Sequence, residues 1–228
     1  MKNAILSFWL IAVLVLFSNA RSLAQYHLGV RAGVNFSNFK PGAFFDYDTR
    51  VGANVALLIN RPLNKVLSIQ LEPGFSQRGA RYETLGEGPL NGAILKSEER
   101  GKFRFNFIEL PVLLQWRPQI GKFTGIVSLG PELRYLAGHV KLKYSSKITY
   151  DGVVTKDESG VVNLESGYGK NTFDYGAVGG LGMGYPVKSV TIFGEARYHL
   201  GLRRLAEGVK TYHRGPSVHI GVLVPMGK

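Results

Sequence analysis

The sequence contains no cysteine in its 228 residues. The chain therefore has no disulfide scaffold, and no cysteine at a cleavage site that could carry a lipoprotein anchor. After residue 24 it also lacks an apolar run approaching the ~20 residues of a membrane helix. If the rest of the chain enters a membrane, it must do so as a closed barrel, because closure leaves no unpaired backbone group in lipid.

The N-terminal segment has the pattern of a secretory signal peptide. Lys2 precedes an apolar run from Ala4 to Phe17, and Ser22 and Ala24 are small residues suited to a cleavage site before Gln25. A retained membrane helix is the alternative, but the run is shorter than the ~20 residues that spanning requires. We expect residues 1–24 to be a signal peptide and residues 25–228 to be the mature domain.

Acidic residues are scarce, with 16 Asp and Glu against 28 Lys and Arg and a formal net charge of +12. A basic balance can indicate nucleic-acid binding, but an exported protein has no ready access to nucleic acid, so we expect no such partner. We also expect no metal and no cofactor. Asp46 and Asp48 suit a solvated loop better than a calcium site. The glycine-rich stretch 179–184 has no lysine or helix after it, so it does not match a phosphate-binding loop.

The stretch Phe103–Arg117 alternates between apolar and polar residues over far more than the ~5–6 residues of a typical soluble strand. Its apolar series consists of Phe103, Phe105 and Phe107, followed by Ile108, Leu110, Val112, Leu114 and Trp116. The change of phase between Phe107 and Ile108 predicts a β-bulge. One apolar, aromatic-ended face and one charged face suit a strand that has lipid on one side and a polar interior on the other.

Seven further stretches alternate in the same way, so the sequence predicts eight strands. They cover residues 26–36, 50–59, 66–78, 103–117, 122–138, 172–185, 190–202 and 215–226. Tight turns alternate with longer connections, which is typical of outer-membrane barrels with short periplasmic turns and long external loops. The predicted fold is all-β, an eight-stranded antiparallel up-and-down transmembrane β-barrel. A soluble lipocalin-like barrel is the alternative.

Aromatic residues gather near the ends of the predicted strands in two groups, as two membrane interfaces require. The group at the tight turns comprises Tyr26, Trp116, Phe123 and Tyr185, and the group at the long connections comprises Phe36, Phe75, Phe103, Tyr135 and Phe173.

Three strand motifs resemble those of the PorT-like outer-membrane β-barrel family, whose members are often labelled porin family proteins. The motifs are Ile108-Glu-Leu-Pro-Val-Leu-Leu114, Gly130-Pro-Glu-Leu-Arg-Tyr135 and Leu71-Glu-Pro-Gly-Phe-Ser-Gln-Arg-Gly79. The resemblance implies a barrel in the outer membrane of a Gram-negative bacterium, and a candidate role as an accessory to protein secretion. Two features depart from the family pattern: the proline of the third motif lies one position late, and the chain ends in Pro-Met-Gly-Lys228 rather than in an aromatic residue.

The polar faces of the predicted strands define a charged interior. Its members are Arg31, Glu72, Arg104, Glu109, Glu132, Arg134, Asp174, Glu195, Arg197 and His199, with His219 beside them. Side chains just fill the lumen of an eight-stranded barrel, and buried charges must be paired, so we expect an ion-pair network and no catalysis. The alternatives are a small diffusion pore, and a lipid-modifying enzyme in which Glu109 and His199 form an acid/base pair.

The tight turns carry only basic charges. They hold Arg61, Lys65, Arg117, Lys122 and Lys188, to which the C-terminal Lys228 adds one more. A ring of one sign attracts anions, so the expected partners at this rim are phospholipid headgroups or an acidic periplasmic protein, such as a component of a secretion system. Elsewhere we expect contacts with outer-membrane lipid and lipopolysaccharide. The sequence thus predicts a structural or interaction module rather than an enzyme.

Overall fold

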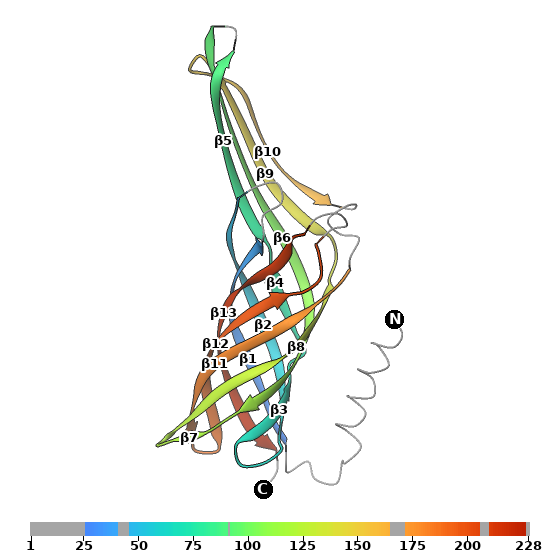
Figure 1. Cartoon of the computed structure of the whole chain (residues 1–228), viewed down its shortest axis with the longest axis vertical. Coiled ribbons are helices and arrows are strands. Elements are labelled where there is room, and N and C mark those ends of the chain that lie inside the picture. The colour runs from blue at the N-terminus through green and yellow to red at the C-terminus, as the bar shows by residue number, and fades with distance from the viewer. Residues whose placement is uncertain (1–25, 41–45, 91, 165–171, 206–209, 227–228) are drawn as a thin grey trace.

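The computed structural model describes residues 26–40, 46–90, 92–164, 172–205 and 210–226. Within these ranges the chain forms antiparallel β-strands that make up one 13-stranded sheet (Figure 1). The predicted all-β antiparallel class is therefore confirmed. No helix in the described ranges is long and apolar enough to cross a membrane. The predicted signal peptide lies outside the described residues.

The strand pairings return to their starting point and form a closed circuit. Its members, in order of pairing, are β1 (Tyr26–Lys40), β2 (Tyr47–Pro62), β3 (Leu67–Leu71) with β4 (Gly74–Arg78), β6 (Ala93–Trp116), β8 (Phe123–Leu136), β11 (Phe173–Val187), β12 (Val190–Gly201) and β13 (Tyr212–Met226). The pairing of β6 with β8 and that of β13 with β1 close this ring. Each of the eight predicted strands corresponds to one position in the ring. The remaining strands lie outside it.

Proline explains why one predicted strand appears as two. Pro73 has no backbone N–H, so the hydrogen-bond ladder is interrupted between β3 and β4. The register nevertheless continues across the gap, because Leu71 pairs with Val112 of β6 and Gly74 pairs with Glu109. The Glu72 amide donates to the Pro111 carbonyl at 3.1 Å, which holds the interrupted segment against β6.

The predicted β-bulge in β6 is wrong. The register of β6 against β4 runs without a shift from Arg78↔Phe105 to Gly74↔Glu109. Phe105 and Phe107 are each 2% exposed and face inward, whereas Ile108 is 56% exposed and faces outward. The strand therefore has a single phase, and its apolar residues change sides between Phe107 and Ile108. Phe103 is also buried inside, so it does not belong to the predicted outer aromatic group.

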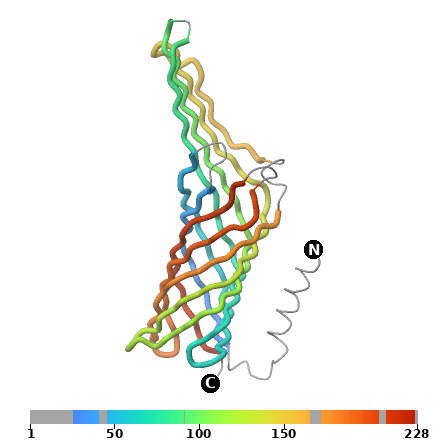
Figure 2. The backbone as a smooth tube through the Cα atoms, viewed as in Figure 1, coloured from blue at the N-terminus to red at the C-terminus, as the bar shows by residue number. Residues whose placement is uncertain are grey.

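Two long hairpins continue the sheet beyond the ring (Figure 2). The first joins β5 (Ala80–Leu90) to the start of β6, and the second joins β9 (Val140–Tyr150) to β10 (Val153–Leu164). Since β6 also pairs with β9, the four strands form one projecting sheet in the order β5, β6, β9, β10. Two of the longer connections between predicted strands, the one before residue 103 and the one after residue 138, are therefore hairpins that extend the sheet.

Glycine allows the turn from the ring into the projecting sheet. Gly79 has φ +147°, and a Cβ placed there would lie 2.1 Å from the Phe103 carbonyl oxygen. Only glycine tolerates both conditions. At the opposite end of the molecule the connections are short, and one of them contains the two-residue strand β7 (Gln119–Ile120), which pairs with the start of β8.

Alternation places apolar side chains outside the ring and polar ones inside. On β2, Val51, Val55 and Leu57 are more than half exposed, whereas Asn54 and Asn60 are buried. Outward aromatic residues lie at both ends. Phe123 and Tyr185 are in contact near the short turns, with ring centroids 5.3 Å apart. Near the projecting sheet, Tyr135 pairs with Phe173 in the register of β8 and β11.

Candidate functional site

The first of two ion-pair clusters inside the ring is centred on Glu72. Arg31 Nε lies 2.8 Å from Glu72 Oε2, and Arg197 Nη1 and Nη2 lie 2.6 Å from Oε2 and 2.8 Å from Oε1. Gln70 donates a further hydrogen bond to Oε1 at 2.6 Å. Arg197 also pairs with Glu195 at 2.7 Å. Glu72 is fully buried, and charge-assisted hydrogen bonds of this kind are what a buried carboxylate requires.

The second cluster is centred on Arg78. Its Nη2 lies 3.0 Å from Glu109 Oε2 and 2.7 Å from Glu132 Oε1. The other oxygen of Glu132 lies 3.0 Å from Nδ1 of His199. Arg31 Nη2 lies 3.5 Å from Glu109 Oε1, so the two clusters form one continuous network.

Strand register places part of this network in one row across neighbouring strands. Glu109 of β6 lies directly opposite Arg134 of β8, and Arg134 lies directly opposite Asp174 of β11. Charges therefore alternate in sign across three neighbouring strands, which favours their pairing. Arg134 Nη2 lies 3.3 Å from Asp174 Oδ2.

The buried charges of the described residues balance. They are the five arginines Arg31, Arg50, Arg78, Arg134 and Arg197, and the five acids Glu72, Glu109, Glu132, Asp174 and Glu195. Removing an ion from water costs several kcal/mol unless a partner compensates it. Equal numbers of each sign leave no net charge in the interior when its histidines are neutral; Arg50 alone of the five arginines donates to a backbone carbonyl, that of Arg78, rather than to a carboxylate.

Apolar layers lie on both sides of the charged network. On the side of the projecting sheet, Phe39, Phe103, Phe105 and Phe107 belong to one buried cluster, and the His213 ring packs edge-on against three of these rings. Toward the short turns, the second cluster consists of Leu58, Ile126, Phe193 and Leu223. The interior is therefore filled by side chains along its length, as expected for a ring of eight strands.

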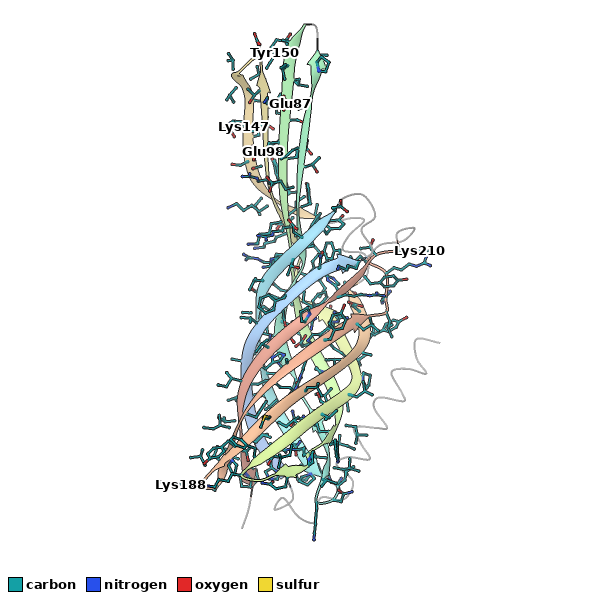
Figure 3. The ribbon with its side chains drawn as sticks, turned by 60° about the vertical axis from the view of Figure 1, so that its left-hand side comes forward. Glu87, Glu98, Lys147, Tyr150, Lys188 and Lys210 are labelled. Atoms are coloured by element: carbon teal, nitrogen blue, oxygen red, sulfur yellow. The ribbon has the colours of Figure 1, made fainter. Side chains whose placement is uncertain are left out.

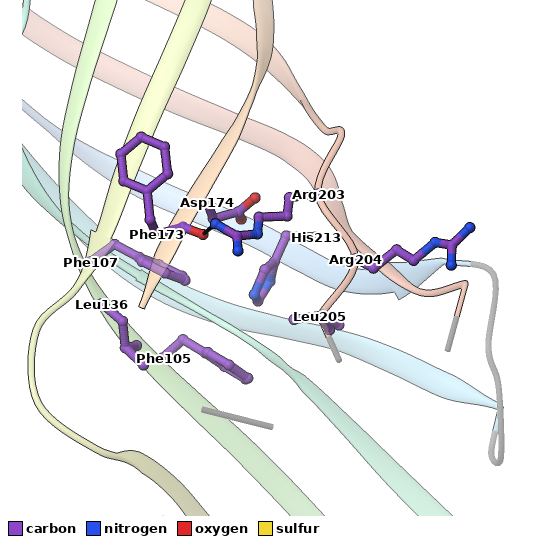
Figure 4. A pocket seen from close by; sticks show the side chains of 9 residues that line it. All are labelled: Phe105, Phe107, Leu136, Phe173, Asp174, Arg203, Arg204, Leu205 and His213. Carbon is purple, nitrogen blue, oxygen red and sulfur yellow. Dashed lines mark hydrogen bonds between the residues drawn. The ribbon is translucent and has the colours of Figure 1, made fainter. Parts of the chain in front are cut away.

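A small cavity remains between the phenylalanine layer and the β12–β13 connection (Figure 4). Its volume of about 20 Å³ is enough for about one water molecule. It is lined by Phe105, Phe107, Leu136, Phe173, Asp174, Arg203, Arg204, Leu205 and His213. A cavity of this size suits a bridging water and not a substrate.

The structure brings a serine, a histidine and an acid into contact. His199 Nε2 lies 2.8 Å from Ser217 Oγ, and His199 Nδ1 faces Glu132. This order of contacts matches that of hydrolytic triads. However, Ser217 is 0% exposed, and its hydroxyl also contacts His219 Nε2 at 2.7 Å. An acyl group cannot approach a hydroxyl that is enclosed in this way, so the contact serves the buried network.

The acid/base pair of Glu109 and His199, considered as an alternative, is not formed as a direct contact. Glu109 is bound by Arg78 and Arg31, and the carboxylate that contacts His199 belongs to Glu132. Glu109 and His199 therefore serve as separate members of the network.

The predicted interior residues are placed as follows. Nine of the ten are buried within the network, namely Arg31, Glu72, Glu109, Glu132, Arg134, Asp174, Glu195, Arg197 and His199, and His219 lies with them. Arg104 is the exception, because its side chain is exposed on the outer face of β6. The error follows from the missing bulge: Phe103 and Phe105 face inward, so the residue between them must face outward.

Sequence reasoning missed two central arginines. Arg78, which binds both Glu109 and Glu132, is buried at the end of β4, and Arg50 donates from β2 to the Arg78 carbonyl at 2.9 Å. Alternation could have identified Arg78, since Ser76 precedes it on the same inward face.

The predicted basic rim lies at the end with the short turns, opposite the projecting sheet (Figure 3, Lys188). Lys65, Lys122 and Lys188 are exposed. Arg61 and Arg117 are partly buried, and the Arg61 guanidinium lies 5.7 Å from the centre of the Tyr26 ring. Lys228 lies outside the described residues.

A family model described as "Outer membrane protein beta-barrel domain" matches residues 17–207 of the chain. The chain belongs to this family. The match includes every described strand from β1 to β12 and stops before β13. The outer-membrane barrel family predicted from the sequence is thus confirmed at this level. A search of curated proteins found no match.

Several solved structures resemble the chain. They include Ail, the attachment invasion locus protein of Yersinia pestis, with 14% identity, 88% of this chain and 98% of that chain covered, and a TM-score of 0.41. Neisserial surface protein A has 10% identity, coverages of 88% and 97%, and a TM-score of 0.39. OprG from Pseudomonas aeruginosa has 14% identity, coverages of 87% and 94%, and a TM-score of 0.37. Similarities of this size give no basis for a functional conclusion.

Replacing Glu72 should destabilise the ring strongly. Glu72→Ala leaves Arg31 and Arg197 buried without their main partner, so we expect the free energy of unfolding to fall by about 3–5 kcal/mol. Urea titration of the detergent-solubilised protein, followed by tryptophan fluorescence, would measure this change. The matched control is Glu83→Ala, which breaks the exposed pair with Arg100 and should cost less than about 1 kcal/mol. Equal effects of the two variants would contradict a stabilising role of the network.

Ser217 should be structural and unreactive. Because its hydroxyl is enclosed, a serine-directed fluorophosphonate should not label the folded protein. Ser217→Ala should lower stability by about 1–3 kcal/mol, because it removes the hydrogen-bond partner of Nε2 in both His199 and His219. Mass spectrometry after incubation with the fluorophosphonate would test the first statement. Labelling of Ser217 in the folded state would show that a substrate can reach it.

Proposed function

We propose that this chain is a non-catalytic, eight-stranded outer-membrane barrel of a Gram-negative bacterium, with its ring in the membrane and its projecting sheet as an external interaction module. The observation that carries this proposal is the polarity of the two faces of the ring. Leu129, Leu181 and Ile220 point outward and are each more than 60% exposed, whereas Glu132 and Arg134 point inward and are 0% exposed. A water-soluble barrel has the opposite arrangement, while lipid requires this one.

Membership in the outer-membrane barrel family supports the same location, and the connection lengths suggest an orientation. In such barrels the short turns face the periplasm and the long segments face outward. The projecting sheet would then stand outside the cell. Its strand β10 has no neighbour on its outer side among the described residues and exposes Val153, Val154 and Val161. An exposed strand edge of this kind suits pairing with another protein segment.

The membrane assignment predicts heat-modifiable migration. A closed barrel should remain folded in detergent at room temperature and should unfold only on boiling, because every strand in the ring pairs on both sides. Electrophoresis of unboiled and boiled samples should therefore give two different mobilities. Solubility without detergent, or one mobility in both samples, would contradict the assignment.

Two assays of the protein reconstituted in lipid distinguish the proposed role from its alternatives, a diffusion pore and a lipid-modifying enzyme. A diffusion pore would give stable ion conductance in a planar bilayer, which the filled interior should prevent. A lipid-modifying enzyme would release fatty acids or altered lipid from vesicles, which mass spectrometry would detect.

We further propose that the basic rim contacts anionic phospholipid headgroups of the periplasmic leaflet. Reversing Lys65, Lys122 and Lys188 to Glu should slow insertion into vesicles that contain anionic lipid, because the exposed rim charges would then be repelled. The matched control reverses Lys96, Lys147 and Lys156, which lie on the projecting sheet, and should insert normally. The measurement is the fraction of heat-modifiable protein over time.

The finer assignment to the PorT-like branch offers a second interpretation of the rim. An accessory role in secretion would provide an acidic periplasmic partner, which the rim would steer into place. In that case the rim variant would insert normally but would lose a salt-sensitive crosslink in cells.

A further inference from the structure

We propose that five cations on the outer face of the projecting sheet, just above the ring, form a site for the phosphate groups of the outer-leaflet glycolipid. This inference rests on the proposed location of the ring in the outer membrane. The five residues, which we call the basic ladder, are Arg81 of β5, Lys102 and Arg104 of β6, and Lys141 and Lys143 of β9.

Strand register forces these cations together. Lys102 lies directly opposite Arg81 on one side and directly opposite Lys143 on the other, and Arg104 lies directly opposite Lys141. Directly paired residues share one face of the sheet with Cβ atoms about 5 Å apart, and like charges in such pairs repel. All five side chains are exposed, so the arrangement is not explained by burial of any of them.

In the described part of the structure, no acidic side chain forms an ion pair with a residue of the ladder. None of the ion pairs formed there involves a ladder residue; Asp48 lies opposite Arg81 in the register but does not pair with it. The pKa of Lys102, which lies outside the ring, is lowered by partial burial and by Arg50, Arg104, Arg81 and Lys143. Positive charge therefore accumulates here at a cost that a bound anion would remove.

In the rest of the same sheet, basic residues are paired with acidic ones. Further from the ring, Arg100 pairs with Glu83 and Glu98 at 2.9 and 2.6 Å, and Lys96 pairs with Glu87 at 3.3 Å. Lys147 lies between Glu98 and Asp157 in the register. Glu87, Glu98 and Lys147 lie in the distal part of the sheet (Figure 3). Charge is thus mixed and paired at the far end, whereas near the ring the five cations have only Asp48 beside them in the register and form no ion pair with it.

The ladder begins just outside the membrane interface. Outward-facing Ile108 of β6 lies between Phe75 and Tyr135 in the register, and such aromatic residues mark the membrane interface. Arg104 lies four residues before Ile108, on the side of the projecting sheet. This separation is about 13 Å along the strand and about 10 Å along the membrane normal at a tilt of 35–45°. Long basic side chains can reach back over several ångströms of this distance. Lipid phosphates at this level are the anions that every inserted molecule would meet.

The first test compares two triple variants of the full chain folded in nonionic detergent. Lys102→Gln, Arg104→Gln and Lys143→Gln remove three ladder charges, and Lys96→Gln, Lys147→Gln and Lys156→Gln remove three charges from the distal part of the same hairpins. Each protein is titrated with bisphosphorylated lipid A and with dephosphorylated lipid A. We expect the ladder variant to lose about tenfold in affinity for the phosphorylated lipid, which corresponds to three weak surface contacts, and the control to change less than about twofold.

Three outcomes of this titration would overturn the proposal. An equal loss in both variants would mean that only net charge matters, and equal binding of both lipids by the wild type would mean that phosphate is not recognised. Displacement of lipid A by millimolar inorganic phosphate would mean that the site takes the free ion rather than the lipid.

The second test uses the sign of a stability change. Without an anion, the ladder variant should have a higher midpoint of thermal unfolding than the wild type, because it lacks the repulsion. With bisphosphorylated lipid A the order should reverse, because only the wild type gains from binding. A variant that is less stable under both conditions would assign the ladder a structural role and overturn the proposal. Heat-modifiable migration of the wild type is checked first, so that failure of the membrane assignment is distinguished from failure of the ladder alone.

Discussion

The pairing of buried arginines with buried acids is the interaction on which the ring depends. A ring of eight strands is too narrow for a channel of water, so its inward side chains must solvate one another. Arg31, Arg78 and Arg197 lie in the middle of the interior, where each guanidinium would cost several kcal/mol without a carboxylate beside it. Their partners come from strands far apart in sequence, such as Glu72 at the break between β3 and β4 and Glu132 on β8. The network is therefore satisfied only when the whole circuit has closed.

Because buried arginines and buried acids are equal in number inside the ring, the net charge of the chain must lie outside it. The interior takes up equal numbers of arginines and acids, so the excess of 28 basic over 16 acidic residues must lie elsewhere. In the structure part of it appears at the short turns and at the basic ladder. Both places lie at the ends of the apolar outer surface, where the lipid headgroups of the two leaflets would be. Charge is thus arranged in layers along the axis of the ring: basic, neutral and paired, basic, and then mixed.

Much of this arrangement follows from alternation in the sequence, because a period of two assigns each residue to one of two faces. The faces of β2, β3 and β12 were predicted in this way, and Glu195, Arg197 and His199 indeed share the inner one. Alternation does not say which face is inside when both carry large apolar residues. In β6 the phenylalanines at 103, 105 and 107 face inward and the aliphatic residues after them face outward, so polarity suggested a bulge that the register excludes.

Other features were beyond the reach of sequence reasoning because they depend on pairing between distant strands. The contact between His199 and Ser217 requires β12 and β13 to lie side by side, and Glu132 reaches His199 from β8, on the far side of β11. The basic ladder was hidden for the same reason, since the acids Glu83, Glu87, Glu98 and Glu99 lie close to its members in sequence and make the segment look mixed. Only the register shows that these acids lie further from the ring.

The continuity of β6 links the two regions that carry charge. One strand supplies Arg104 to the ladder and Glu109 to the interior, and between them the phenylalanine layer separates an exposed basic surface from a buried neutral network. Because this layer keeps water away from the ion pairs, their attraction is screened less than that of exposed pairs. The ladder, by contrast, faces outward and lies within reach of mobile anions. The same residue types therefore stabilise the ring where they are paired inside it, and attract a ligand where they are unpaired outside it.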